Sequence, residues 1–155
     1  METTLNIIRK TVRFLVIIFF IYMVLAVFYQ VLGRYIFSYK LGAAAETATF
    51  AQIWMILLAS GIAMRKNMHV GVDILLRKLS VKNQKIIITA STIVIMVFLI
   101  MVLKGSVQLI MVGAQSTSPA ISVPMWIPYL SVPISIVYIM LELMILTFTR
   151  LKKKN

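Results

Sequence analysis

Few residues in this 155-residue chain can carry ionisable or metal-binding chemistry. The chain has no cysteine, one histidine (His69) and four acidic residues, Glu2, Glu46, Asp73 and Glu142. This composition excludes thiol chemistry, disulfides, cysteine-ligated metals and iron–sulfur clusters. One histidine cannot form a bis-histidine haem site or a histidine-based metal site. With no phosphate loop, nucleophile motif or metal-ligand cluster in the sequence, we predict a protein that is not an enzyme and has no cofactor and no metal.

The composition instead predicts a membrane protein. Hydrophobic residues make up 61% of the chain, charged residues 13%, and the mean hydropathy is +0.99. About 20 apolar residues in a helix cross the hydrocarbon core of a bilayer. Four runs meet that length, at about 14–32, 47–64, 86–111 and 127–148. We therefore expect an all-α integral membrane protein with four transmembrane helices, forming a single membrane domain over 1–155.

The basic residues predict the orientation of these spans. The net charge is +12, and thirteen of the sixteen lysines and arginines lie before the first run, between the second and third, or after the fourth. By the positive-inside rule both termini are cytoplasmic. Contact with membrane lipids accounts for the charge, and no basic stripe with interleaved aromatics indicates nucleic-acid binding. The charge-free run Phe14–Gly33 is too long for a signal peptide, so we expect an uncleaved first span.

The cytoplasmic loop contains a segment with two different faces. From Asp73 to about residue 84, apolar Ile74, Leu75 and Leu79 alternate with basic residues at helical spacing. This pattern predicts a short amphipathic helix in the headgroup plane. An ordinary connecting turn is the alternative.

Two carboxylates lie close to or within apolar runs, where an unpaired charge is costly. Glu46 precedes the second span and Arg34 ends the first, so a short hairpin would bring them together as an ion pair. A role for Glu46 as a proton or sodium ligand is the alternative. Glu142 lies in the cytoplasmic third of the fourth span, where we expect a structural pair or a contact with a partner subunit. Possible partners at that depth are Lys85, Arg13 and Arg65.

Arg65, His69 and Asp73 are spaced by four residues, which places them on one face if the second helix continues that far. An aspartate and a histidine near an arginine suit an interface or a helix cap. They resemble a catalytic dyad only superficially, since no serine or cysteine nucleophile accompanies them.

The segment before the fourth span is rich in proline. It contains all four prolines of the chain, Pro119, Pro124, Pro128 and Pro133. Proline lacks an N–H and disfavours helix in the residue before it, so we expect an extended segment along the outer surface. Trp126 and Tyr129 suit the interfacial aromatic belt. Pro128 suits a first helical turn, and Pro133 predicts a kink near the outer end of the fourth span.

Several short motifs follow one another in a fixed order. They are QVLGRYIF at Gln30–Phe37, Glu46, Gly61 with MHVGVD at Met68–Asp73, SPA at Ser118–Ala120, and VPMW at Val123–Trp126 followed by Tyr129 and Pro133. Together they resemble the DctQ-type small integral membrane subunit of the tripartite ATP-independent periplasmic (TRAP) transporters. The resemblance covers most of the chain, and the length, the four spans and the orientation agree with it.

This resemblance implies a scaffold subunit of a sodium-coupled secondary transporter in the bacterial inner membrane. Its implied partners are a large multi-span DctM-type subunit, which holds the substrate and sodium sites, and a periplasmic DctP-type binding protein. The implied cargo is an organic acid anion of the C4-dicarboxylate or sialic-acid type. The amphipathic segment would anchor the scaffold, and the proline-rich loop would meet the binding protein. The candidate structural or interface residues are Arg34, Glu46, Arg65, His69, Asp73, Trp126, Tyr129 and Glu142.

Two other interpretations differ in testable ways. A self-sufficient four-helix exporter of the small multidrug kind has an essential glutamate in its first span, whereas the run 14–32 has no acidic residue. The membrane anchor of a quinone-linked oxidoreductase would require haem-ligating histidines.

Overall fold

The computed structural model describes residues 2–36, 42–65 and 80–153, and within these ranges the regular structure is helical. The helices are α1 (Glu2–Tyr35), α2 (Gly42–Arg65), α4 (Val81–Ala114), α5 (Trp126–Tyr129) and α6 (Ser131–Lys153). All except the one-turn α5 are long and apolar enough to cross a membrane. The predicted all-α architecture with four spanning helices is confirmed.

The helices extend beyond the apolar runs that predicted them. The largest difference is in α1, which begins at Glu2 rather than near Phe14, and α4 begins at Val81 rather than near Ile86. Hydropathy marks only the part of a helix that lies in hydrocarbon. The same helix can continue through the headgroup region, because its backbone stays paired and its polar side chains reach water. The N-terminal extension of α1 therefore carries basic residues that still belong to the bundle.

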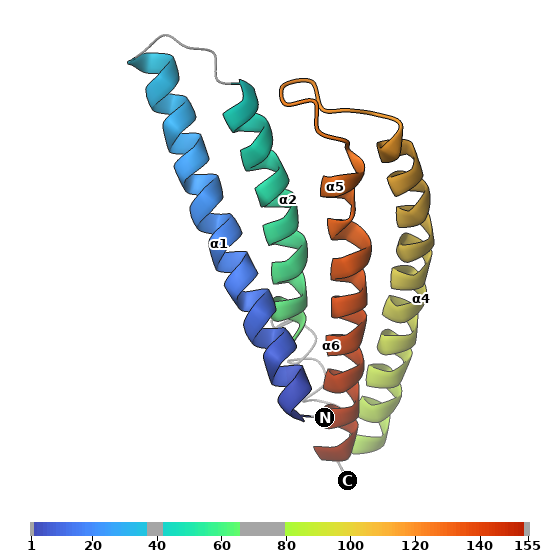
Figure 1. The fold of residues 1–155 in the computed structure, drawn as a ribbon. Coiled ribbons are helices and arrows are strands. Elements are labelled where there is room, and N and C mark those ends of the chain that lie inside the picture. Colours follow the sequence, from blue (N-terminus) through green and yellow to red (C-terminus); the bar gives the residue numbers. More distant parts are fainter. Residues whose placement is uncertain (1, 37–41, 66–79, 154–155) are drawn as a thin grey trace.

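The four long helices form an open row in the order α1, α2, α6, α4 (Figure 1). Contacts join α1 to α2, α2 to α6, and α6 to α4, so the last helix of the chain lies between the second and the third spans. Both termini lie at the same end, opposite the 115–125 loop (Figure 1). That the end with the termini is cytoplasmic remains a prediction. Most of the predicted amphipathic segment, including Ile74, Leu75 and Leu79, lies outside the described residues.

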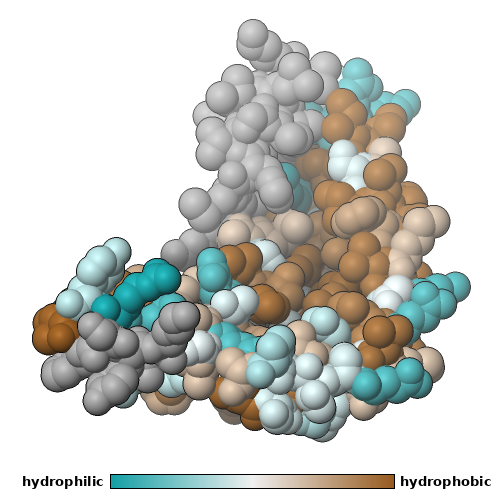
Figure 2. Space-filling view, turned by 90° about the horizontal axis from the view of Figure 1, so that it is seen from above, coloured by the Kyte–Doolittle hydropathy of each residue, from teal (hydrophilic) through white to brown (hydrophobic). Residues whose placement is uncertain are grey.

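Two apolar clusters hold the row together. The first joins α1, α2 and α6 through Val12, Leu58 and Tyr138, and beside it the rings of Phe19 and Trp54 stack with centroids 6.0 Å apart. The second joins α4 and α6 through Leu99, Ile136 and Leu143. Burial is least in α1, where 6% of the most apolar window is buried, and greatest in the span containing α6, at 33%. The flanks of the row are therefore largely apolar and uncovered, and a broad hydrophobic area is visible from the end opposite the termini (Figure 2).

Close contact between α2 and α6 depends on small and polar residues. Ser131, Ser135, Tyr138 and Glu142 recur at helical spacing along α6, and all four are buried. Gly61 of α2 faces this side of α6, and the ring of Tyr138 occupies the space that a Cβ on Gly61 would need. Small residues let two backbones approach in lipid, where the hydrophobic effect between helices is absent.

The 115–125 loop, which we predict to lie on the outer side and therefore call the outer loop, folds back on itself instead of running extended along the surface. Ser118 donates its backbone N–H to Val123 O (2.9 Å), and Ser122, with φ of 54°, donates its backbone N–H to Ser118 O (3.0 Å). The expectation of an extended segment is therefore wrong for this loop, because its backbone groups pair with one another across a tight turn.

The interruption that separates α5 from α6 lies at Leu130, three residues before Pro133. Because Pro133 has no N–H, it cannot bond to the carbonyl of Tyr129, which is the bond that would continue α5. Pro133 instead occupies the first turn of α6, where a helix needs no such donor. Pro128 is buried within α5.

Candidate functional site

The most deeply buried ionisable side chain among the described residues is Glu142 on α6, which is 1% exposed. Arg9 of α1 binds it through two parallel hydrogen bonds, from Nε to Oε1 (2.7 Å) and from Nη2 to Oε2 (2.6 Å). The hydroxyl of Tyr138, one turn earlier on α6, donates to Oε1 at 3.3 Å. The carboxylate is thus held by a planar guanidinium fork and by a phenol.

This geometry compensates the Glu142 charge within the chain. Paired Arg–carboxylate hydrogen bonds are among the strong hydrogen bonds of side chains, and they satisfy a charge that lipid would not solvate. The side chain of Arg9 is itself only 17% exposed, so the pair is shielded on both sides. A carboxylate engaged in this way acts as a structural tie between the first and last helices of the chain and is not free to bind a transported ion.

The sequence-based candidates for the partner of Glu142 are corrected by this geometry. Lys85, Arg13 and Arg65 lie at a suitable depth, but the partner in the structure is Arg9. Hydropathy places the beginning of the first span at Phe14 and so leaves Arg9 outside it. A signal was present in the sequence, since residues 9, 12, 16 and 19 recur at helical spacing, and Val12, Val16 and Phe19 face the apolar cluster.

Glu46, in the second turn of α2, is bound to the outer loop. Its Oε2 accepts the backbone N–H groups of Ala120 (2.9 Å) and Ile121 (3.2 Å). The tip of the loop also approaches Gly42, where an added Cβ would lie 3.6 Å from Ala120 Cβ. Glu46 therefore fixes the loop between α4 and α5 against the beginning of α2.

The expected ion pair between Arg34 and Glu46 is absent from the described part of the chain. Arg34 is exposed at the outer end of α1, and the Glu46 carboxylate is turned toward the loop instead. Two backbone amides supply the donors that the arginine was expected to supply. The short distance in sequence between the end of α1 and the beginning of α2 could not reveal these donors, because they lie 74 and 75 residues from Glu46 along the chain.

The remaining predicted residues occupy different places. Trp126 and Tyr129 form α5, whose contact with α4 requires Gly113: an added Cβ there would lie 2.6 Å from the Tyr129 ring. Arg65 is exposed at the end of α2, on the side of the termini. His69 and Asp73 lie outside the described residues. Within the described ranges, no group of three or more histidine, cysteine or acidic residues lies together.

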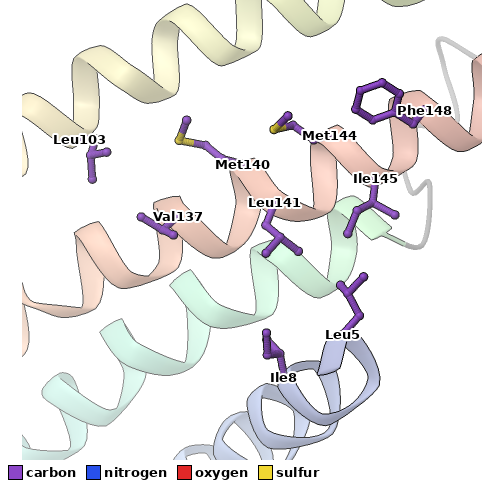
Figure 3. Close-up of a pocket in the computed structure, with 9 residues that line it drawn as sticks. All are labelled: Leu5, Ile8, Leu103, Val137, Met140, Leu141, Met144, Ile145 and Phe148. Carbon is purple, nitrogen blue, oxygen red and sulfur yellow. The ribbon is translucent and has the colours of Figure 1, made fainter. Parts of the chain in front are cut away.

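A large apolar groove of about 650 Å³ lies between the beginning of α1 and α6 (Figure 3). Its walls come from the beginning of α1 and from α6, with one residue of α4. The lining residues are Leu5, Ile8, Leu103, Val137, Met140, Leu141, Met144, Ile145 and Phe148. With no polar side chain in the lining, the groove suits acyl chains or apolar protein surface and is unsuited to an organic anion.

Residues 23–153 match the family model described as tripartite ATP-independent periplasmic transporters, DctQ component. The chain belongs to this DctQ family. The match begins within α1, at residue 23, and continues to the end of α6, so it includes α2, α4, α5 and α6 and the last part of α1. A DctQ protein is a transporter component, and its family as a whole is not a family of enzymes. With four spanning helices, this DctQ chain is a multi-pass protein of the bacterial inner membrane.

Individual relatives agree with this assignment. The chain is 29% identical over 92 residues to the C4-dicarboxylate TRAP transporter small permease protein DctQ of Rhodobacter capsulatus, covering 58% of this chain and 40% of that protein. It is 36% identical over 115 residues to the isethionate TRAP transporter permease protein DctMQ of Oleidesulfovibrio alaskensis, covering 69% and 18%. A C4-dicarboxylate small permease protein of Vibrio cholerae is 29% identical over 94 residues, covering 61% and 40%. The matches thus span less than half the length of these relatives.

Proposed function

We propose that this chain is the scaffold subunit of a binding-protein-dependent secondary transporter and does not itself bind the cargo. The observation that carries the proposal is the use of both described membrane carboxylates in ties within the chain. Glu142 is held by Arg9 and Tyr138, and Glu46 is held by the amides of the outer loop. Binding an anion and a cation requires polar groups that converge on an open site, and these two carboxylates are committed elsewhere.

The partner that this proposal requires is a large DctM-type membrane subunit. The name DctMQ of the Oleidesulfovibrio relative combines the M and Q designations, and the present chain matches 18% of that protein. The open row of helices leaves room for such an association, because its flanks are uncovered in the single chain. Association in lipid would depend on close packing between the helices of the two subunits, since apolar surface alone is equally well covered by lipid.

The proposed cargo is an organic acid anion, moved in symport with sodium after delivery by a periplasmic DctP-type protein. The relatives are named for C4-dicarboxylate and for isethionate, which are both small organic anions. A C4-dicarboxylate is therefore the substrate to test first, and a sialic-acid type of anion, which the family resemblance implies, comes next. The outer loop, fixed by Glu46, is the surface that we assign to contact with the binding protein.

Purification of the tagged chain from its native membrane in mild detergent tests the scaffold proposal. We expect a large multi-span protein to accompany it at a ratio of one to one, identified by mass spectrometry. Proteoliposomes containing both subunits should take up the organic anion when the binding protein and a sodium gradient are supplied. The scaffold chain alone should show no uptake.

The same preparation tests the small multidrug-type exporter. Recovery of the chain alone or as a homo-oligomer, together with transport by the isolated chain, would contradict the scaffold proposal. In that case Glu46→Gln and Glu142→Gln would be the informative variants. The Arg9–Glu142 pair argues against this outcome, since an exporter needs a carboxylate that can release its partner and bind its substrate.

A further inference from the structure

A second pocket, of about 480 Å³, lies at the end of the bundle that carries the termini, and its lining is basic. It is formed between α1 and α2 by Asn6, Ile7, Arg9, Lys10, Arg13 and Arg65. Arg9 is neutralised by Glu142, so three cations remain. Lys10, Arg13 and Arg65 are exposed, and none of them forms an ion pair with another described residue. Such a pocket attracts an anion.

The position of the cations fixes the depth of this pocket in the bilayer. Arg13 directly precedes the charge-free run that begins at Phe14, and Arg65 directly follows the uncharged run that ends at Met64. Two neighbouring helices thus enter the hydrocarbon at the same level, with an arginine at each boundary. The plane of lipid phosphate groups lies at this boundary.

An adjacent pocket, also of about 480 Å³, continues along α1 toward the hydrocarbon. Lys10, Thr11, Arg13, Phe14 and Ile17 line it, so the two pockets share Lys10 and Arg13. The first pocket, which is polar and lined by cations, therefore opens directly into the second, which ends at apolar Phe14 and Ile17. A free phosphate would occupy the first pocket alone. A phospholipid could place its phosphodiester in the first pocket and an acyl chain in the second.

We propose that Lys10, Arg13 and Arg65 bind the phosphodiester of an anionic phospholipid, with one acyl chain lying along Phe14 and Ile17. Arginine forks match phosphate oxygens, and lysine adds a point charge. The Arg9–Glu142 pair bounds the site on the side of α6 and leaves the other three cations available. The bound lipid connects the beginning of α1 to the end of α2.

Native mass spectrometry of the full chain in detergent tests this site, with phosphatidylglycerol and phosphatidylcholine of identical acyl chains as probes. We expect one phosphatidylglycerol to be retained in preference to phosphatidylcholine. Each lysine or arginine near a membrane surface contributes about 1 kcal/mol to anionic-lipid attraction, which is roughly fivefold in affinity. The variant with Lys10→Gln, Arg13→Gln and Arg65→Gln should therefore lose on the order of a hundredfold, and Arg34→Gln at the outer end should lose nothing.

Two further arms separate the lipid from a soluble anion. Dihexanoyl phosphatidylglycerol should bind more weakly than its long-chain form, and Phe14→Ser with Ile17→Ser should abolish that difference while the cations remain. Inorganic phosphate should not displace the long-chain lipid at equal concentration. Equal retention of phosphatidylglycerol and phosphatidylcholine, undiminished binding by the triple variant, or displacement by inorganic phosphate would each overturn the proposal. The comparison of lipids on the unaltered chain does not depend on any variant folding.

Discussion

At the scale of single residues, the Arg9–Glu142 pair holds two charges that are largely removed from solvent. Each charge would be strongly disfavoured alone in an apolar surrounding, and the two are compatible with it only together. Each of the two residues therefore contributes to the stability of the fold only when the other is present. Removing one partner should be far more damaging than removing both.

A double-mutant cycle tests this condition. Arg9→Met leaves Glu142 uncompensated and should lower the free energy of unfolding by about 3–5 kcal/mol. Arg9→Met combined with Glu142→Leu should recover most of that loss, since similar-sized apolar pairs often replace a buried ion pair without penalty. Circular dichroism during titration with a denaturing detergent measures the stabilities. A double variant as unstable as the sum of the two single variants would show that the residues act independently.

Two glycines provide a matched comparison of helix packing. The Tyr138 ring fills the space beside Gly61, whereas no atom lies within 4 Å of a Cβ added to Gly105 on α4. Gly61→Ala should therefore destabilise the protein by about 1–3 kcal/mol through overpacking. Gly105→Ala should be neutral or stabilising by roughly 0.5–1 kcal/mol, because alanine favours the helix. Thermal unfolding in the same detergent compares the two, and equal stability would mean that α2 and α6 do not meet at Gly61.

At the scale of elements, the tie between α2 and the outer loop can be measured through the loop's own amides. Glu46→Ala removes the acceptor for Ala120 and Ile121, so hydrogen exchange at these amides should accelerate about tenfold, as expected for a hydrogen bond to a charged group. Glu46→Gln retains an acceptor oxygen and should have a smaller effect. Arg34→Ala should leave the exchange of these amides unchanged. If Arg34→Ala accelerated their exchange as much as Glu46→Ala does, the Arg34–Glu46 ion pair expected from the sequence would be supported after all.

The elements themselves were predictable because hydropathy and charge act locally. An apolar run of about 20 residues predicts a helix that spans the membrane. Pro133 likewise marks the interruption before α6 to within a few residues. The contacts between elements were not predictable in this way. Glu46 was assigned to the nearest arginine in the sequence, but the donors come from a loop 74 residues away. Arg9 was missed because a hydropathy boundary was mistaken for the beginning of a helix.

At the scale of the whole molecule, the open row distinguishes this chain from a closed four-helix bundle. A bundle would bury one face of each helix around a common core, whereas here α1 and α4 each have one main neighbour. The apolar side chains that a closed bundle would bury remain on the flanks. A row of this kind has the form of a wall, which suits a subunit that supports a larger neighbour along its length.

The separation of the ion-paired residues along the chain has a consequence for biogenesis. Arg9 leaves the ribosome 133 residues before Glu142 does. Until then the arginine has no carboxylate to bind and its helix must wait near the headgroups, where water solvates the guanidinium. We therefore expect the α1–α6 contact to form only after the last span has entered the membrane, so that assembly order differs from insertion order.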